Sequence, residues 1–127
     1  SSAASDVYKR QLEGRRVLVV EDETLVAMLV EDTLLDAGAQ VLGPVATVAA
    51  ALQLIQTERP DVAVLDLNLA GETSEPIADA LTGMNVPFVV ASGYGQAGVP
   101  TRHANVPVLA KPYAPEELTQ ALARLLP

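Results

Sequence analysis

The stretch DVAVLDLNLAGE, residues 61–72, carries the clearest structural signal in this sequence. It begins with a continuous apolar run, Val62-Ala63-Val64-Leu65, which ends in the carboxylate of Asp66. A short run without polar alternation is typical of a strand that is buried on both faces. An acid at the end of such a strand is expected at the rim of a sheet, and other residues that follow buried strands are expected beside it.

Four similar apolar runs, at residues 15–20, 39–46, 86–92 and 106–110, predict further strands. Between these runs lie segments whose apolar residues recur at helical spacing. The predicted helices run from residue 24 to Gly38, from a cap at Thr47, from Thr73 or Ser74 through Leu81, and from Pro115 onward. The Gly- and Pro-rich segment 93–105 allows at most a short fourth helix. The alternation predicts an α/β, doubly wound fold with a five-stranded parallel sheet and about five helices.

Composition limits both the size and the class of the protein. The 127 residues suffice for one domain, and half are hydrophobic but only 3% aromatic, so the core must be built from Val, Leu, Ile and Ala. Residues 1–14 are polar and without period, which predicts a disordered leader or a remnant of cloning before a domain over 15–127. The opening lacks the apolar segment of a secretory signal.

Charge and cysteine content exclude several classes of function. The net charge of −8 argues against binding to the phosphate backbone of nucleic acid and against an anionic membrane surface. Cysteine is absent, which excludes disulfides and thiolate chemistry. No apolar run approaches the ~20 residues needed to span a bilayer. A cytoplasmic location is the default expectation.

Polar residues with compatible chemistry follow four of the predicted strands. In sheets of this kind, ligands bind outside the carboxyl ends of the strands. The first strand is followed by the acidic run 21–23, and the third by Asp66 and Asn68. The fourth strand ends in Ser92 and the fifth in Lys111. These side chains are therefore expected to gather at one edge of the sheet.

Such a set has the parts that phosphoryl transfer needs. Carboxylates that lie close together repel one another unless a cation is present, and a few oxygen ligands suit Mg²⁺. An ionised Asp66 is already nucleophilic, while Ser92 and Lys111 can stabilise the oxygens of an incoming phosphoryl group. Taken singly, the acids can cap a helix, Asp66 can be a turn residue, Ser92 can bond to backbone, and Lys111 can be a solvated charge. Their joint occurrence favours the site.

Four motifs carry a resemblance to a known family. VLVVEDE, PDVAVLDLNLAGE, VVASGYG and LAKPYAPEEL occur in the order and spacing of a response regulator receiver domain of two-component signalling. The resemblance covers residues 16–126 and implies a flavodoxin-like fold with strand order 2-1-3-4-5. It implies that Asp66 is the phosphoacceptor. It also implies that Asp22 and Asp66 hold Mg²⁺ through their side chains, Asn68 through its backbone carbonyl and Glu21 through water.

The same resemblance implies roles for residues after the fourth and fifth strands. Ser92 matches the switch hydroxyl, and Lys111 matches the family's lysine, whose bond to the following proline is usually cis. Many receivers have Tyr or Phe where this sequence has Val108. The segment PFVVASGYG is partly similar to a subgroup with a Phe-Ala-Thr-Gly-type motif, and Tyr94 is the candidate replacement for the aromatic switch. The switch and output positions are thus Tyr94, Val108, Pro112 and Tyr113.

The resulting hypothesis is a phosphorylation-controlled switch rather than an enzyme, apart from catalysis of its own phosphorylation and dephosphorylation. Its donor would be a histidine kinase or histidine phosphotransfer protein. A downstream protein would contact the face of the fourth helix, fifth strand and fifth helix. The sequence stops directly after the last predicted helix, which leaves open a stand-alone receiver or a segment of a hybrid kinase.

Two alternative functions remain open, one of them less favoured. The first is a phosphorylation-independent interaction module with the same fold. The second is an Asp-nucleophile phosphatase, which needs a second Asp where this sequence has Asn68. His103 is the single histidine, and we expect it to be a solvent-facing loop residue rather than a phosphodonor or metal ligand.

Overall fold

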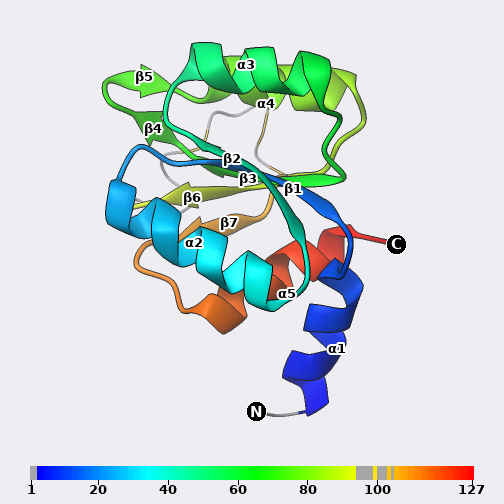
Figure 1. The fold of residues 1–127 in the computed structure, drawn as a ribbon. Coiled ribbons are helices and arrows are strands. Elements are labelled where there is room, and N and C mark those ends of the chain that lie inside the picture. The colour runs from blue at the N-terminus through cyan, green and yellow to red at the C-terminus, as the bar shows by residue number, and fades with distance from the viewer. Residues whose placement is uncertain (1–2, 94–98, 100–102, 104) are drawn as a thin grey trace.

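Five parallel strands form the central sheet, as the computed structural model shows for the described residues 3–93, 99, 103 and 105–127 (Figure 1). The strand order is β2-β1-β3-β6-β7, which confirms the predicted doubly wound, flavodoxin-like arrangement. The strands are β1 (Arg16–Val20), β2 (Gln40–Val45), β3 (Val62–Asp66), β6 (Phe88–Ser92) and β7 (Val108–Ala110).

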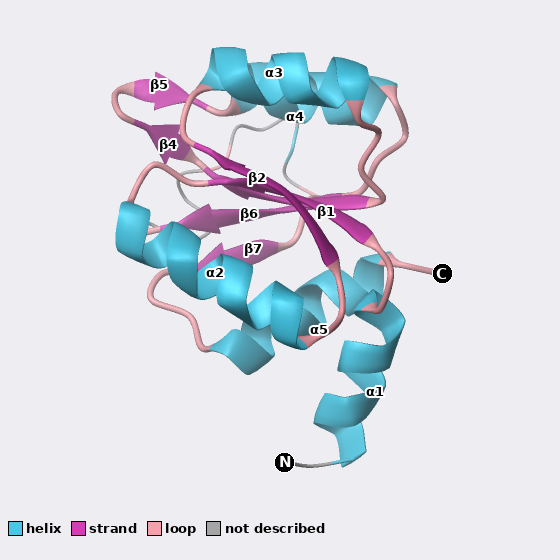
Figure 2. Cartoon of the chain, in the orientation of Figure 1, coloured by secondary structure: helices cyan, strands magenta, loops and turns pink. Residues whose placement is uncertain are grey.

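Helices cover both faces of the sheet (Figures 1 and 2). One face is covered by α2 (Thr24–Asp36) and α5 (Pro115–Leu125), and the other by α3 (Val48–Thr57) and α4 (Glu75–Gly83). Successive strand residues point to opposite faces, so each continuous apolar run supplies two cores. In β3, for example, Val62 and Val64 join the core beside α2 and α5, whereas Ala63 and Leu65 join the core beside α3 and α4.

Strand register brings the polar ends of the strands to one edge. Val20 of β1 lies beside Leu65 of β3, and Asp66 lies beside Ala91 of β6. Ser92 in turn lies beside Ala110 of β7. The residues that follow these positions therefore leave the sheet side by side, as the sequence predicts.

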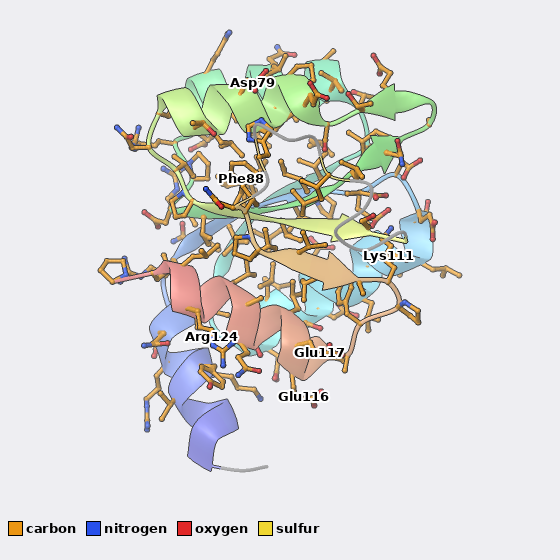
Figure 3. All side chains as sticks on the ribbon, turned by 180° about the vertical axis from the view of Figure 1, so that it is seen from behind. Asp79, Phe88, Lys111, Glu116, Glu117 and Arg124 are labelled. Carbon is orange, nitrogen blue, oxygen red and sulfur yellow. The ribbon has the colours of Figure 1, made fainter. Side chains whose placement is uncertain are left out.

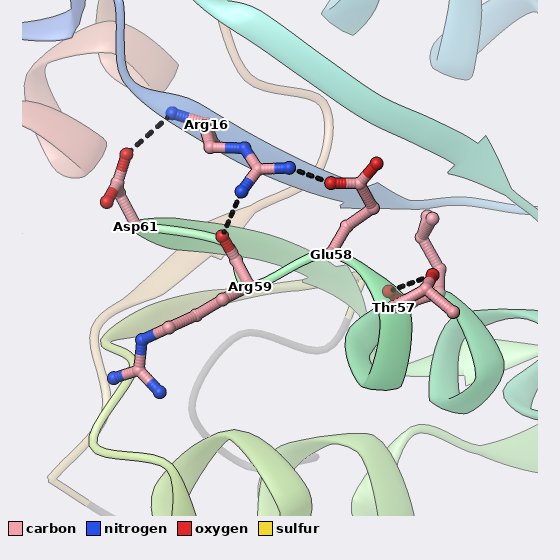
Figure 4. Close-up of polar contacts among 6 residues, drawn as sticks. Arg16, Thr57, Glu58, Arg59 and Asp61 are labelled. Carbon is pink, nitrogen blue, oxygen red and sulfur yellow. Dashed lines mark hydrogen bonds and ion pairs between the residues drawn. The ribbon is translucent and has the colours of Figure 1, made fainter.

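At the opposite ends of the strands, where β1 and β3 begin, backbone and side-chain contacts connect neighbouring elements (Figure 4). The backbone N–H of Arg16 donates to the Asp61 carboxylate at 2.8 Å, and the Arg16 guanidinium pairs with Glu58. Arg59 donates to the carbonyl of Met84, which ends α4, at 2.7 Å. These contacts hold the start of β1, the start of β3 and the end of α4 together, far from the acidic edge.

The first residues differ from the prediction. Residues 1–14 are predicted to be a disordered leader or a remnant of cloning, whereas Ala3–Leu12 form helix α1, which lies beside α5. Leu12 is fully buried in the core beside α2 and α5, and Gln120 donates to the Tyr8 hydroxyl at 3.3 Å. One buried leucine does not produce a helical repeat, which is why the sequence pattern does not reveal this helix.

A small antiparallel hairpin follows β3. It consists of β4 (Asn68–Leu69) and β5 (Glu72–Thr73), joined by Ala70 and Gly71. Both turn residues have positive φ, 51° and 92°, which is the pattern of a type I′ turn. The strand and helix periodicities do not predict this hairpin because each of its strands has only two residues.

The short fourth helix that the sequence allows falls in a segment lying largely outside the described residues. Tyr94, the candidate aromatic switch, also lies outside them. Among the described helices, none combines the length and apolar character needed to cross a membrane.

Candidate functional site

Lys111 and two acids form the centre of the acidic edge. The Lys111 ammonium lies 3.0 Å from Glu21 Oε1 and 3.1 Å from Asp66 Oδ2. Glu21 directly follows β1, Asp66 ends β3 and Lys111 directly follows β7, so three strands hold the three groups. Glu21 is only 5% exposed and Asp66 only 8%. One ammonium group therefore pairs with two nearly buried carboxyl groups.

Glu21 is electrostatically unusual. Burial raises the pKa of its carboxyl to about 7, with Asp66 adding to the rise, while the N–H of Glu23 and the ammonium of Lys111 oppose it. The Glu23 N–H donates to Glu21 Oε2 at 3.1 Å. The prediction from the family resemblance places Glu21 on a metal through water. The structure adds a direct ion pair with Lys111, which the sequence pattern does not indicate.

Lys111 is held by its backbone as well as by its ion pairs. Burial lowers the pKa of its ammonium, but the contacts with Glu21 and Asp66 outweigh burial and raise the pKa overall. Its backbone N–H donates to the carbonyl of Ser92 at 3.0 Å. The Lys111-Pro112 peptide bond is cis, as the resemblance implies.

Asp22 completes an acidic cluster that could hold a metal ion. Ligand oxygens of Glu21, Asp22 and Asp66 all lie within 4.8 Å of one another. An all-oxygen set with a partly exposed member suits Mg²⁺, which keeps several waters when it binds. These residues therefore fit the ion that the family implies. The role of the Asn68 carbonyl, at the start of β4, remains a prediction.

The predicted switch and output residues lie around this centre. Ser92 is 1% exposed at the end of β6, next to the site. Tyr113 is half-buried, and burial together with the negative charge of Glu21 raises the pKa of its phenol to about 12. Pro112 and Tyr113 line a groove of about 350 Å³ against α2, whereas Val108 lines one of about 360 Å³ against α5. Their switching roles remain predictions.

His103 is not the solvent-facing residue that the sequence suggests. It is buried, and its Nε2 lies 2.9 Å from Asp79 Oδ1 on α4. Its ring meets that of Phe88 edge-on, with the centroids 5.9 Å apart (Figure 3 labels Asp79 and Phe88). The sequence shows no acid near His103 because Asp79 is 24 residues away and is brought close only by folding.

The hairpin turn contributes a contact that sequence reasoning missed. The backbone N–H of Ala70 donates to Asp22 Oδ2 at 3.0 Å. Gly71 in the LAGE segment is the local signal for a turn, but nothing in the sequence indicates that the N–H of Ala70 reaches Asp22, 48 positions away.

Comparison with known proteins finds a matching protein family and similar solved structures. The family model for the response regulator receiver domain matches residues 17–123. The solution structure of SdrG from Sphingomonas melonis Fr1 is similar, with 42% sequence identity and a TM-score of 0.78. That comparison covers 88% of this chain and 96% of the SdrG chain.

Two curated relatives are larger proteins. The transcriptional regulatory protein PdtaR of Mycobacterium tuberculosis is 25% identical over 112 residues, which are 85% of this chain and 55% of PdtaR. The phyllosphere-induced regulator PhyR of Methylorubrum extorquens is 26% identical over 114 residues, which are 87% of this chain and 43% of PhyR. The chain thus spans about half the length of these relatives.

Proposed function

Because the chain belongs to the response regulator receiver domain family, we propose that it accepts a phosphoryl group on Asp66. The donor is the phosphohistidine of a histidine kinase or histidine phosphotransfer protein. The observation that carries the proposal is the position of Asp66, held at the end of β3 with its Oδ2 3.1 Å from the Lys111 ammonium.

The chemistry follows from the residues at the edge of the sheet. An Asp66 carboxylate oxygen attacks phosphorus, the bond from phosphorus to the donor's imidazole nitrogen breaks, and an acyl phosphate forms. Lys111, which already contacts Asp66, remains beside the new negative charge and pairs with a phosphoryl oxygen. Ser92 donates its hydroxyl to another phosphoryl oxygen. Later attack by water on phosphorus restores the carboxylate and releases phosphate.

A divalent cation belongs to this proposal. Asp22 and Asp66 would hold Mg²⁺ through their carboxylates and Asn68 through its carbonyl, with Glu21 acting through water. When bound, Mg²⁺ neutralises part of the charge on the transferring phosphoryl group. The protein is then a signalling switch in the cytoplasm, without turnover of an external substrate.

Phosphorylation is proposed to act on a protein-interaction face. The face includes β7 and α5, and the predicted switch residues Ser92 and Val108 connect it to the site. A downstream protein would bind there, and the net charge of −8 disfavours nucleic acid and anionic membranes as partners.

Incubation with Mg²⁺ and acetyl phosphate, followed by intact mass measurement, tests the proposal. We expect a gain of one phosphoryl group, which Asp66→Asn abolishes and EDTA prevents. The matched control is Asp32→Asn, an acid-to-amide change at an exposed position of α2, which should leave phosphorylation unchanged.

The same experiment separates the other two functions. A folded wild-type protein that gains no phosphoryl group would support a phosphorylation-independent interaction module. Sustained release of phosphate from phosphate esters would support a phosphatase. Either result contradicts the proposed switch.

A further inference from the structure

We infer that the backbone N–H of Ala70 positions the Asp22 carboxylate for Mg²⁺, so that the β4–β5 hairpin is a working part of the metal site. The inference rests on the proposed function and adds a residue that acts through another rather than touching the ion. Ala70 is thus a positioning residue, and the group that acts is its amide, not its side chain.

The contact itself joins two distant parts of the chain. Ala70 N lies 3.0 Å from Asp22 Oδ2, although the two residues are 48 positions apart. Asp22 lies in the loop between β1 and α2, where its side chain is partly exposed. A hydrogen bond to one carboxylate oxygen limits rotation of the side chain and fixes the direction of the other oxygen.

Hairpin geometry explains why this N–H is available. In a two-residue hairpin the ladder bonds join the residues that flank the turn, here Leu69 and Glu72. The N–H of Ala70, inside the turn, is not needed by the ladder. Its φ of 51° and that of Gly71, 92°, give the turn its shape, and the buried Leu69 anchors it to the core.

The three acids of the cluster are each held by a donor. Glu21 and Asp66 share the Lys111 ammonium, whereas Asp22 receives the N–H of the hairpin. Asn68, whose carbonyl is the third proposed direct ligand beside the carboxylates of Asp22 and Asp66, belongs to the same hairpin. The hairpin therefore supplies one proposed ligand and orients another, which links its conformation to the binding of the ion.

Replacing the Ala70 amide by an ester tests the inference. Incorporation of L-lactic acid at position 70 exchanges N–H for oxygen and keeps the methyl group. Loss of such an outer hydrogen bond typically weakens metal binding about 10-fold or more, so the Kd for Mg²⁺ measured by calorimetry should rise by at least that factor. The matched control is the same amide-to-ester exchange at Ala49, an exposed residue in the first turn of α3, where backbone N–H groups have no intrahelical partner. Its Kd should stay within about twofold of wild type.

The outcomes distinguish this inference from the function on which it rests. Wild-type protein that binds no Mg²⁺ overturns the proposed metal site itself. Wild-type and ester proteins that bind Mg²⁺ equally overturn only the role of Ala70.

A measurement on unaltered protein covers the case in which the ester variant does not fold. NMR of the Mg²⁺-saturated wild type should show a scalar coupling across the hydrogen bond between the Ala70 nitrogen and the Asp22 carboxyl carbon. Absence of this coupling, with Mg²⁺ bound, also overturns the inference.

Discussion

Glu21 shows how strongly a single residue depends on its surroundings. In the sequence it is one of three consecutive acids, but in the structure it is nearly fully buried and paired with Lys111. Its raised pKa means that the folded protein retains a proton on this carboxyl at pH values where an unfolded chain has lost it. The buried, negatively charged neighbourhood that raises this pKa is also what attracts a cation.

A pH dependence of stability follows from this residue. The pKa of Glu21 rises from its ordinary 4.5 to about 7 on folding. The stabilisation that protonated Glu21 provides is complete below about pH 4.5 and is lost as the pH rises through 7. With EDTA present, wild type should therefore lose stability relative to Glu21→Gln between these values. Urea unfolding midpoints of both proteins across this range measure the difference, and a difference independent of pH contradicts the prediction.

At the scale of elements, helix ends and one turn show how local chemistry produces local structure. The predicted cap Thr47 does cap α3, because its Oγ1 accepts the N–H of Ala50 at 3.1 Å. Ser74 precedes α4, and Pro115 opens α5 with Glu116 and Glu117 in its first turn. The hairpin between β4 and β5 relies instead on two residues with positive φ, one of which is an alanine.

Removal of the α3 cap should destabilise the protein measurably. Thr47→Ala leaves the N–H of Ala50 without its side-chain partner, and we expect the free energy of unfolding to fall by about 1 kcal/mol. Thr47→Ser retains the hydroxyl and should lose much less. Denaturant unfolding of the three proteins measures both changes. Equal losses for Ala and Ser would show that the hydroxyl is not what matters.

The hairpin turn offers a substitution in the opposite direction. Ala70 has a φ of 51°, which is unfavourable for alanine and favourable for asparagine, and Asn-Gly is preferred in type I′ turns. We expect Ala70→Asn to raise the free energy of unfolding by about 0.5–1 kcal/mol. Thermal or urea unfolding in EDTA measures the change. A destabilised variant would argue against the type I′ conformation.

At the scale of the whole molecule, the sheet separates two apolar cores. The core beside α2 and α5 contains Leu122, which is fully buried, whereas Leu35 on α2 is 54% exposed. Both cores are built mainly from aliphatic residues, as the low aromatic content predicts. The sheet between them is the rigid support that places the acidic edge.

Two leucine substitutions compare the loss of stability at a buried position with the loss at an exposed one. Leu122→Ala in α5 should lower the free energy of unfolding by about 2–5 kcal/mol, because it leaves a cavity in the core. Leu35→Ala, the same change on an exposed helix position, should alter it by no more than about 0.5 kcal/mol. Chemical denaturation of both variants tests the assignment. Similar losses would show that the two positions do not differ in burial as described.

Local patterns in the sequence were enough to predict the five strands of the central sheet, helices α2 to α5 and the edge where the acids meet. Apolar runs, helical spacing and caps each act over a few residues, so they can be recognised without knowing the fold. Contacts between distant residues cannot be recognised in this way. The Asp22–Ala70 hydrogen bond, the Asp79–His103 pair and the burial of Leu12 depend on which segments the folded chain brings together.

The sequence by itself determined that Asp66 ends a buried strand and that an acidic run, Ser92 and Lys111 follow neighbouring strands. Tertiary structure alone decided how these groups are paired. It placed Lys111 between Glu21 and Asp66 and raised the pKa of Glu21. It also turned the N–H of Ala70 toward Asp22. The reason is physical: residue type sets what a group can do, but distance, burial and orientation set how strongly it acts, and these arise only when the strands are in register.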